Sequence, residues 1–445
     1  MNQTHTSFII QGGSALHGSV KVAGAKNAAY KLMIAALLGS NESKILNLPA
    51  ISDVEMVAEV IESLGGIAKA AGEGTRIIDP RSLNSFQIGE QYGAVSRAST
   101  LFIPALLVRF GEARVPLPGG DQIGERPLER HFAGLEKMGA VFSREEGMLV
   151  VQADGLRGTH YKFTKNTHTG TETLLMAAVL AEGKTVLENA ALEPEVDDLI
   201  VLLNEMGADI KRTTHRTIEI NGVAQLGGAT HKVMPDRNEA ISYACAALAT
   251  KGDIVVENAR EQDLRAFLDK LDEAQAGYEI KDYGIRFFYK GPLQATELTT
   301  EIHPGFMTDW QPLWAILMCH AEGVSTIHEA VMQNRFQYVE VLQQMGAKIE
   351  SWQPEVNNPE QFYNFNWQDA KAEDVRAIKI TGPTNFTGGE FTVHDLRAGA
   401  TTLIAAISGT GQTTLHNVEQ IERGYSAIDE KLVSMGANIQ RLGSD

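Results

Sequence analysis

Three basic side chains lie in segments that do not follow the core pattern of the chain. Lys26 follows Gly24 at the predicted start of a helix. Arg397 and Arg423 each lie close to a glycine and an acidic residue. Backbone N–H groups at a helix start favour an anion, and a lysine adds a point charge there. Each residue alone is also explained by an exposed helix-start lysine or a surface salt bridge. As a set, the three cations can converge on a small anion only if the two halves of the chain face one another.

A glycine-rich loop, Pro118–Arg130, is the second candidate for chemistry. It contains Gly119, Gly120 and Gly124 and carries Asp121 at its centre. Such a loop is either a plain connection from strand to helix or a lid hinged over a reacting centre. The residues alone leave both interpretations open.

Several common catalytic signatures are missing from the sequence. It contains no P-loop, no dinucleotide-binding fingerprint after a first strand, no HExxH and no Cys/His metal spacing. Dinucleotide, nucleotide-hydrolysis and zinc chemistry are therefore disfavoured, and we expect no metal and no cofactor.

Composition limits the partners and the compartment. The formal net charge of −17 argues against nucleic acid or an anionic membrane surface as a partner, although basic groups focused in one cleft can still bind a small anion. No apolar run is long enough to span a bilayer, and no secretory signal is visible. Cys245 and Cys319 lie in apolar helix-like runs and are predicted to be reduced core residues. A cytoplasmic location is expected.

The elements that must position these residues come from a unit that recurs six times. Each copy has an apolar helix, a turn, a β-branched strand and a second, amphipathic helix that is predicted to end at a glycine in the left-handed conformation. The six glycines are Gly65, Gly139, Gly207, Gly277, Gly346 and Gly436. The last interval is longer because of the segment 350–376, which is predicted to be a polar surface insertion.

Six such copies predict an α/β protein of two domains, each with three βαβα-type units and pseudo-threefold symmetry. The first domain is expected over 25–233 and carries the loop 117–130. The second is expected over 1–24 plus 234–445, with the N-terminal strand completing it.

The motifs GAKNAA, PGG–x–x–IG–x–RP, HPGFMTDWQ, NRF, DLRA and RGY, in this order, resemble the enolpyruvyl transferase family. Within that family they are similar to the branch that uses UDP-N-acetylglucosamine. The resemblance implies an inside-out α/β barrel whose two domains close on substrate. It also implies transfer of the enolpyruvyl group of phosphoenolpyruvate to the 3′-hydroxyl of UDP-N-acetylglucosamine by addition and elimination, with release of phosphate. This would be the first committed step of peptidoglycan synthesis.

The resemblance also implies roles for individual residues. Lys26 and Asn27 match a pair that binds phosphoenolpyruvate, and Arg126, Arg397 and Arg423 match arginines that hold its phosphate and carboxylate. Asp309 matches the residue proposed to take the proton from the sugar hydroxyl. The positions matched to the sugar-nucleotide site are Arg97, Arg126, Pro127, Leu128, Glu129, Arg130, Lys165, Asn166, Thr167, His168, Asp309, Val331 and Arg335.

The chain departs from the family pattern at three places. Asp121 stands where the family usually has Cys, so a carboxyl group would have to act as the general acid with a raised pKa. A lower pH optimum and insensitivity to fosfomycin, which alkylates the thiolate, are expected. Glu129 replaces a usual Asp, and Thr167–Thr171 replaces a usual Ser-Val-Gly-Ala-Thr.

Two alternatives remain at this stage. The first is the same chemistry on another acceptor, such as shikimate 3-phosphate or a different sugar nucleotide. The second is a catalytically silent relative that binds nucleotide sugars, in which case phosphate would not be released.

Overall fold

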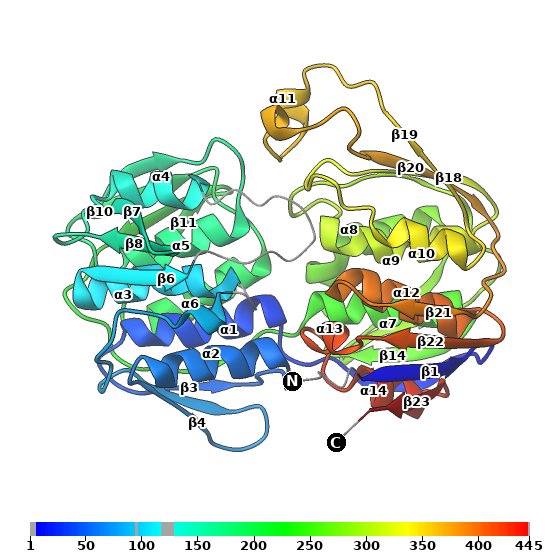
Figure 1. The fold of residues 1–445 in the computed structure, drawn as a ribbon, viewed down its shortest axis with the longest axis horizontal. Coiled ribbons are helices and arrows are strands. Elements are labelled where there is room, and N and C mark those ends of the chain that lie inside the picture. The colour runs from blue at the N-terminus through cyan, green and yellow to red at the C-terminus, as the bar shows by residue number, and fades with distance from the viewer. Residues whose placement is uncertain (1–5, 94–96, 117–128, 444–445) are drawn as a thin grey trace. The chain divides into compact units, whose positions relative to one another are not determined.

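The computed structural model describes residues 6–93, 97–116 and 129–443 (Figure 1). The chain divides into two compact units. Unit 2 begins at Gly24 and ends at Met234, and unit 1 combines Met1–Ala23 with Pro235–Asp445. Most of the buried apolar side chains form one cluster inside each unit, so each unit has its own hydrophobic core.

Within its described residues, unit 2 has three sheets, with the strand orders β13-β3-β5-β4, β6-β8-β7 and β9-β10-β12-β11. Two of these sheets each take their strands from one stretch of the chain, and the third adds β13 from the far end of the unit. The strands are β3 (Ser43–Leu46), β4 (Ile67–Ala70), β5 (Arg76–Asp79), β6 (Glu112–Pro116), β7 (Val141–Glu145), β8 (Met148–Gln152), β9 (His160–Lys162), β10 (Lys184–Glu188), β11 (Asp209–Thr214), β12 (Thr217–Asn221) and β13 (Thr230–Lys232). The helices are α1 (Lys26–Ala35), α2 (Ser52–Ser63), α3 (Ile103–Phe110), α4 (Glu129–Lys137), α5 (His168–Ala178) and α6 (Pro194–Glu205), with 3₁₀ turns η1 (Ala36–Leu38), η2 (Glu90–Tyr92) and η3 (Arg97–Phe102).

The described part of unit 1 also has three sheets, with the orders β21-β22-β1-β23, β15-β16-β14-β2 and β17-β18-β20-β19. Its strands are β1 (Ser7–Gln11), β2 (His17–Lys21), β14 (Asp253–Glu257), β15 (Gly277–Lys281), β16 (Gly284–Phe288), β17 (Glu297–Thr299), β18 (Gly323–His328), β19 (Lys348–Trp352), β20 (Ala377–Gly382), β21 (Glu390–Thr392), β22 (Gln412–His416) and β23 (Asn438–Leu442). Its helices are α7 (Arg237–Ala249), α8 (Glu261–Glu273), α9 (Gln311–His320), α10 (Tyr338–Gln344), α11 (Pro359–Phe362), α12 (Leu396–Ser408), α13 (Glu419–Glu422) and α14 (Ile428–Ser434), with 3₁₀ turns η4 (Thr308–Trp310) and η5 (Trp367–Asp369).

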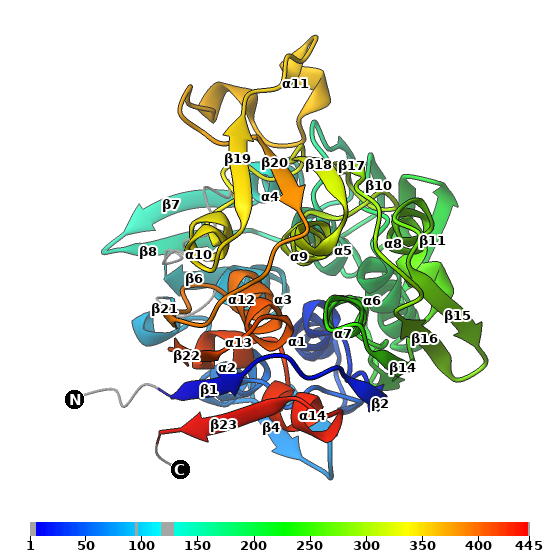
Figure 2. The same ribbon diagram turned by 90° about the vertical axis from the view of Figure 1, so that its right-hand side faces the viewer.

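The first helix of each repeat in unit 1 lies inside the unit, and the sheets lie around these helices. Helices α7, α9 and α12 pack against one another, and the strands surround them in Figure 2. Every residue of α7 is buried, as expected for a helix whose side chains are mostly small and apolar on nearly all sides. This arrangement is the predicted inside-out α/β barrel, which is confirmed.

Five of the six predicted helix-ending glycines have a positive φ: Gly65, Gly139, Gly207, Gly346 and Gly436. The prediction is wrong for Gly277, which is the first residue of β15. In that repeat Gln275, with φ 57°, takes the left-handed position after α8. Gly277 is required for another reason, because a Cβ there would lie 2.3 Å from the carbonyl oxygen of Phe288.

The N-terminal strands complete sheets of unit 1, as predicted for the first of them. Strand β1 lies between β22 and β23 and is antiparallel to both, while β2 is parallel to β14. In unit 2, the last strand β13 is parallel to β3 of the first repeat. Each unit is therefore closed by pairing between segments far apart in the sequence.

The segment 350–376 is not simply a polar surface insertion, as the sequence suggested. It contains α11 and η5, and Tyr363 and Phe365 are buried in a small cluster with Ala330. The rings of Tyr363 and Trp367 stack with centroids 5.1 Å apart. The insertion therefore has a small aromatic core of its own beside the end of β18.

Cys245 and Cys319 are free and buried, as predicted. Within the residues that the structure describes, the helices are too short or too polar to cross a bilayer.

Candidate active site

The first candidate group lies at the start of α1 in unit 2. Gly24 lies just before this helix. The position requires glycine, because a Cβ there would lie 1.8 Å from the carbonyl oxygen of Asn47. Lys26 is the first residue of α1, and its Nζ lies 2.9 Å from Asp53 Oδ2. The side chain of Lys26 is only 14% exposed, so it is not an ordinary surface lysine. Asn27 follows it and is partly buried.

A buried cluster of charges joins α1 to α5 behind this helix start. Lys31 Nζ lies 2.5 Å from Glu172 Oε2, and His168 Nε2 lies 3.1 Å from Glu172 Oε1. The side chains of Lys31 and Glu172 are 2% and 0% exposed, whereas that of His168 is 21% exposed. We call Lys31, Glu172 and His168 the unit 2 cluster.

The three charges of the unit 2 cluster stabilise one another against burial. Burial acts to raise the pKa of Glu172, but His168 and Lys31 outweigh it and the pKa is lowered. Burial likewise acts to lower the pKa values of Lys31 and His168, yet Glu172 outweighs it and both are raised. The cluster therefore favours an ionised carboxylate between two cations.

The starts of α4 and α5 bring other predicted residues together. Arg130 Nη1 donates to the carbonyl oxygen of Asn166 at 3.4 Å, and the buried side chain of Asn166 donates to the carbonyl of Asn189 at 3.0 Å. Thr167 is the N-cap of α5, and its hydroxyl accepts from Gly170 N at 3.2 Å. Lys165 is partly buried just before this cap. Arg130, Asn166, Thr167 and His168 thus belong to one region of unit 2.

The second candidate group lies in unit 1, around Asp309 of η4. Arg335 Nη2 lies 2.6 Å from Asp309 Oδ1, and Arg397 Nη2 lies 3.9 Å from Asp309 Oδ2. The two arginine side chains are 5% and 6% exposed, whereas Asp309 is 23% exposed. We call Asp309, Arg335 and Arg397 the unit 1 cluster. It places a carboxylate that solvent can reach between two buried guanidinium groups.

Arg397 is held at the start of α12. Asp395 is the N-cap, and its carboxylate accepts from the backbone N–H of Arg397 at 2.9 Å. Arg397 Nη1 donates to the hydroxyl of Tyr425 at 2.8 Å. Burial acts to lower the pKa of Arg397, but Tyr425 and Asp309 outweigh it and the pKa is raised. Arg397 is therefore a buried, permanently charged cation rather than a surface salt bridge.

Two more predicted residues lie in unit 1. Arg423 follows α13, is partly exposed, and donates to Gln420 Oε1 at 3.4 Å. Val331 lies in the turn after β18, and its backbone N–H donates to Glu329 Oε1 at 2.8 Å.

Asp121, Arg126, Pro127 and Leu128 lie outside the described residues. Arg97 begins η3 and Glu129 begins α4, and only their backbones are described.

Sequence analysis missed two members of the unit 2 cluster, Lys31 and Glu172. Each is a single charge within an apolar helical run, AAYKLMIAALL or TGTETLLMAA. Lys and Glu are almost never fully buried unless paired. A search for charged residues on helices predicted to be buried would have found both.

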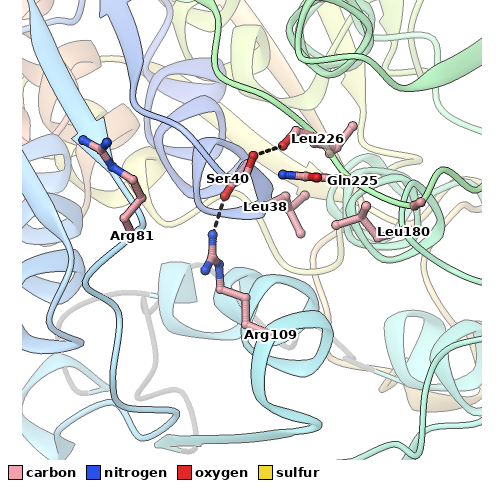
Figure 3. A pocket seen from close by; sticks show the side chains of 9 residues that line it. Leu38, Ser40, Arg81, Arg109, Leu180, Gln225 and Leu226 are labelled. Atoms are coloured by element: carbon pink, nitrogen blue, oxygen red, sulfur yellow. Dashed lines mark hydrogen bonds between the residues drawn. The ribbon is translucent and has the colours of Figure 1, made fainter.

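A cavity of about 350 Å³ lies at the other end of α1 in unit 2 (Figure 3). It is lined by Leu38, Gly39, Ser40, Arg81, Arg109, Leu180, Ala224, Gln225 and Leu226. Arg109 donates to the carbonyl oxygens of Leu37 and Gly39, and burial lowers the pKa of Arg109. This guanidinium therefore bonds carbonyls at a helix C-terminus.

The sequence matches the family model described as EPSP synthase (3-phosphoshikimate 1-carboxyvinyltransferase) over residues 10–432. The chain belongs to this family. Within the EPSP synthase family, it is 40% identical to UDP-N-acetylglucosamine 1-carboxyvinyltransferase 3 of Caldanaerobacter subterraneus, over 98% of this chain and 99% of that protein. It is 38% identical to UDP-N-acetylglucosamine 1-carboxyvinyltransferase of Idiomarina loihiensis, with the same coverage. The chain is therefore an enzyme of the transferase class.

Solved structures of the EPSP synthase family share the fold. The enolpyruvyl transferase NikO from Streptomyces tendae matches with a TM-score of 0.85 at 23% identity, over 100% of both chains. EPSP synthase from Acinetobacter baumannii matches with a TM-score of 0.71 at 19% identity, over 99% of this chain and 100% of the other.

Proposed function

We propose that this enzyme transfers the enolpyruvyl group of phosphoenolpyruvate to the 3′-hydroxyl of UDP-N-acetylglucosamine and releases phosphate. The observation that carries the proposal is the identity of 38–40%, over 98% of the chain, to relatives named for this acceptor. The chain would act in the cytoplasm, at the first committed step of peptidoglycan synthesis.

The proposed donor binding depends on fixed positive charge. Phosphoenolpyruvate carries close to three negative charges, and a guanidinium can hold a phosphate or carboxylate through two hydrogen bonds. Arg397 suits this role because it is charged, buried and oriented by Tyr425 and the α12 cap. Lys26, Asn27, Arg126 and Arg423 are the other proposed ligands of the donor. The same cations would stabilise charge that develops on the leaving phosphate.

Asp309 is the proposed general base for the sugar hydroxyl. A carboxylate can accept a proton, the contact with Arg335 at 2.6 Å orients this one, and its partial exposure leaves it accessible. The proposed binding set for the sugar nucleotide consists of Arg97, Arg126–Arg130, Lys165–His168, Val331 and Arg335.

Asp121 is the proposed general acid that protonates C3 of the donor. A free aspartic acid is only about 0.1% protonated at neutral pH, so its pKa would have to be raised in the enzyme. We therefore expect a pH optimum lower than that of a relative with cysteine, and an Asp121→Cys variant should move the optimum upward. An unchanged profile would contradict this role.

Resistance to fosfomycin follows from the same residue. A carboxylate is a much poorer nucleophile than a thiolate toward the epoxide of the drug, so the purified enzyme should keep its activity during prolonged incubation. The Asp121→Cys variant is the matched control and should lose activity with time. Time-dependent, irreversible inactivation of the unmodified enzyme would refute the prediction.

The reaction itself is tested by phosphate release with phosphoenolpyruvate and a panel of acceptors. UDP-N-acetylglucosamine should support turnover, and shikimate 3-phosphate, the acceptor that the description of the family model suggests, should not. Turnover with shikimate 3-phosphate alone would overturn the proposed acceptor, and absence of phosphate release with every acceptor would overturn the proposed reaction.

A further inference from the structure

Glu329 is a buried carboxylate directly after β18, and no role has been given to it so far. Its side chain is 1% exposed. Oε1 accepts hydrogen bonds from the Thr300 hydroxyl at 2.7 Å and from the backbone N–H groups of Val331 and Met332 at 2.8 and 2.9 Å. Oε2 accepts from the hydroxyl of Thr308 at 2.9 Å. Four donors thus converge on one carboxylate.

Three of these four donors, all except Thr300, belong to the two segments that carry the Asp309–Arg335 contact. Thr308 is the residue before Asp309 in η4. Met332 lies in the turn that leads to Arg335, and Arg335 Nη1 lies 2.9 Å from Met332 Sδ. Arg335 Nη2 then reaches Asp309 Oδ1 at 2.6 Å. The carboxylate of Glu329 therefore holds both segments together at one point. The Asp309–Arg335 contact joins the same two segments at a second point.

The insertion 350–376 holds the same turn from its other side. The backbone N–H of Asn364 donates to the carbonyl of Ala330 at 2.8 Å, and Gln333 Nε2 donates to Asp374 Oδ2 at 2.6 Å. The turn is therefore held by Glu329 on its buried side and by the insertion on its more exposed side.

An apolar residue at position 329 would not support this arrangement. Burial raises the pKa of Glu329, while the bond from Thr300, the charge of Arg335 and the two amides act in the opposite direction. Removing the carboxylate would leave the buried N–H groups of Val331 and Met332 without their acceptor. A glutamine, in contrast, keeps one oxygen for three of the donors, and its amide group can donate to the Thr308 hydroxyl.

We propose that Glu329 is a positioning residue that sets Asp309 against Arg335 for the reaction. This inference rests on the proposed function, because it assumes that Asp309 is the base. In this proposal Glu329, which is buried, acts by fixing the segments on which the base and its arginine stand.

The test compares Glu329→Ala with Glu329→Gln. The alanine variant should lose about 100-fold in kcat with little change in KM for phosphoenolpyruvate, because a shift of about 1 Å at a reacting group has an effect of that order. The glutamine variant should stay close to the unmodified enzyme. Ser325→Ala is the matched control, since Ser325 Oγ accepts from Thr296 N at 3.2 Å in the same region but bonds neither segment of the contact.

A crystal structure of each variant gives a second result that does not depend on activity. The Asp309–Arg335 contact of 2.6 Å should be lost in the alanine variant and kept in the glutamine variant. If the alanine variant does not fold, Thr308→Val removes the hydrogen bond from the Thr308 hydroxyl to Glu329 and should lower kcat by about 10-fold.

The inference is overturned if Glu329→Ala, or Thr308→Val in its place, folds and keeps both kcat and the contact. It is also overturned if the glutamine variant is as impaired as the alanine variant. Failure of the unmodified enzyme to release phosphate is a different result, which refutes the proposed function, and the crystal structures still decide the role of Glu329.

Discussion

The unit 1 and unit 2 clusters contain similar groups but are solvated differently. In unit 2, Lys31 and Glu172 are almost completely buried, and only His168 of that cluster is partly exposed. In unit 1 the two arginines are buried, and the carboxylate of Asp309 is the exposed member. A buried pair can orient groups but cannot readily exchange a proton, whereas an accessible carboxylate can. The clusters therefore differ in whether solvent reaches the carboxylate, and the variants below test whether that difference separates a structural role from a chemical one.

The largest effect is expected in unit 1 for Asp309→Asn. Asparagine keeps the shape and an acceptor for Arg335 but removes the proposed base, so kcat for phosphate release should fall by about 1000-fold. The unfolding midpoint should also fall, because the buried guanidinium of Arg335 loses its counter-charge, so kcat is compared per folded enzyme. Asp269→Asn is the control, because Asp269 is 57% exposed on α8, and it should leave kcat unchanged. A fully active Asp309→Asn enzyme would refute the proposed role of Asp309 as the general base.

The next largest effect is expected in unit 2 for Lys31→Met, which leaves Glu172 buried without its lysine. Breaking a buried pair costs about 3–5 kcal/mol in the free energy of unfolding. Denaturant unfolding should show this loss, and a second change, Glu172→Leu, should recover most of it.

The control is Lys270→Met, which removes a partly exposed pair with Glu273 and a hydrogen bond to the carbonyl of Glu297, and should cost at most ~1 kcal/mol. If the single and double variants lose the same stability, the pair has no structural role.

A smaller effect concerns pH and has a defined sign in unit 2. The pKa of His168 is raised above 6.5, so its interaction with Glu172 adds stability that is fully present below pH 6.5 and is lost as pH rises through the folded value. The loss of stability in His168→Gln should therefore be larger at about pH 6 than at about pH 9, by up to ~1 kcal/mol after allowance for its exposure. Equal losses at both pH values would show that the charge of His168 does not contribute.

The opposite sign is expected in unit 1 for His320. Burial, together with the charge of Lys251, lowers the pKa of His320 to about 4, so this ring stays neutral in the folded state while it becomes charged near pH 6.5 on unfolding. Its burial therefore destabilises the protein as pH falls from 6.5 toward 4. His320→Gln can keep the hydrogen bond to Ser408 and should lose less stability over that window in acid denaturation.

The sequence predicted the fold better than it predicted the clusters. The six-fold repeat led to the buried first helices and to the N-terminal strand in unit 1, because hydrophobic periodicity and glycine placement are local signals. The error at Gly277 arose because Gln275 occupies the left-handed position, which a search for glycine does not detect. The aromatic core of the insertion was missed because its apolar residues are scattered among polar ones.

Asp309, Arg335 and Arg397 were found because they interrupt the repeat. The sequence did not indicate that Asp309 lies between the two arginines, since that contact joins segments 26 and 88 residues apart. Lys31 and Glu172 were hidden for the opposite reason, because they lie inside the repeat on helices whose residues are mostly buried.

The pairing of β1 has a consequence for folding while the chain is synthesised on the ribosome. Its partners, β22 and β23, are synthesised last, so the first strand to emerge must wait for almost the whole chain before its sheet can form. The described part of unit 2 lies between these segments in the sequence and can form its core while synthesis continues. Completion of unit 1 should thus be the late event, and β1, unpaired until then, the segment most exposed to wrong partners.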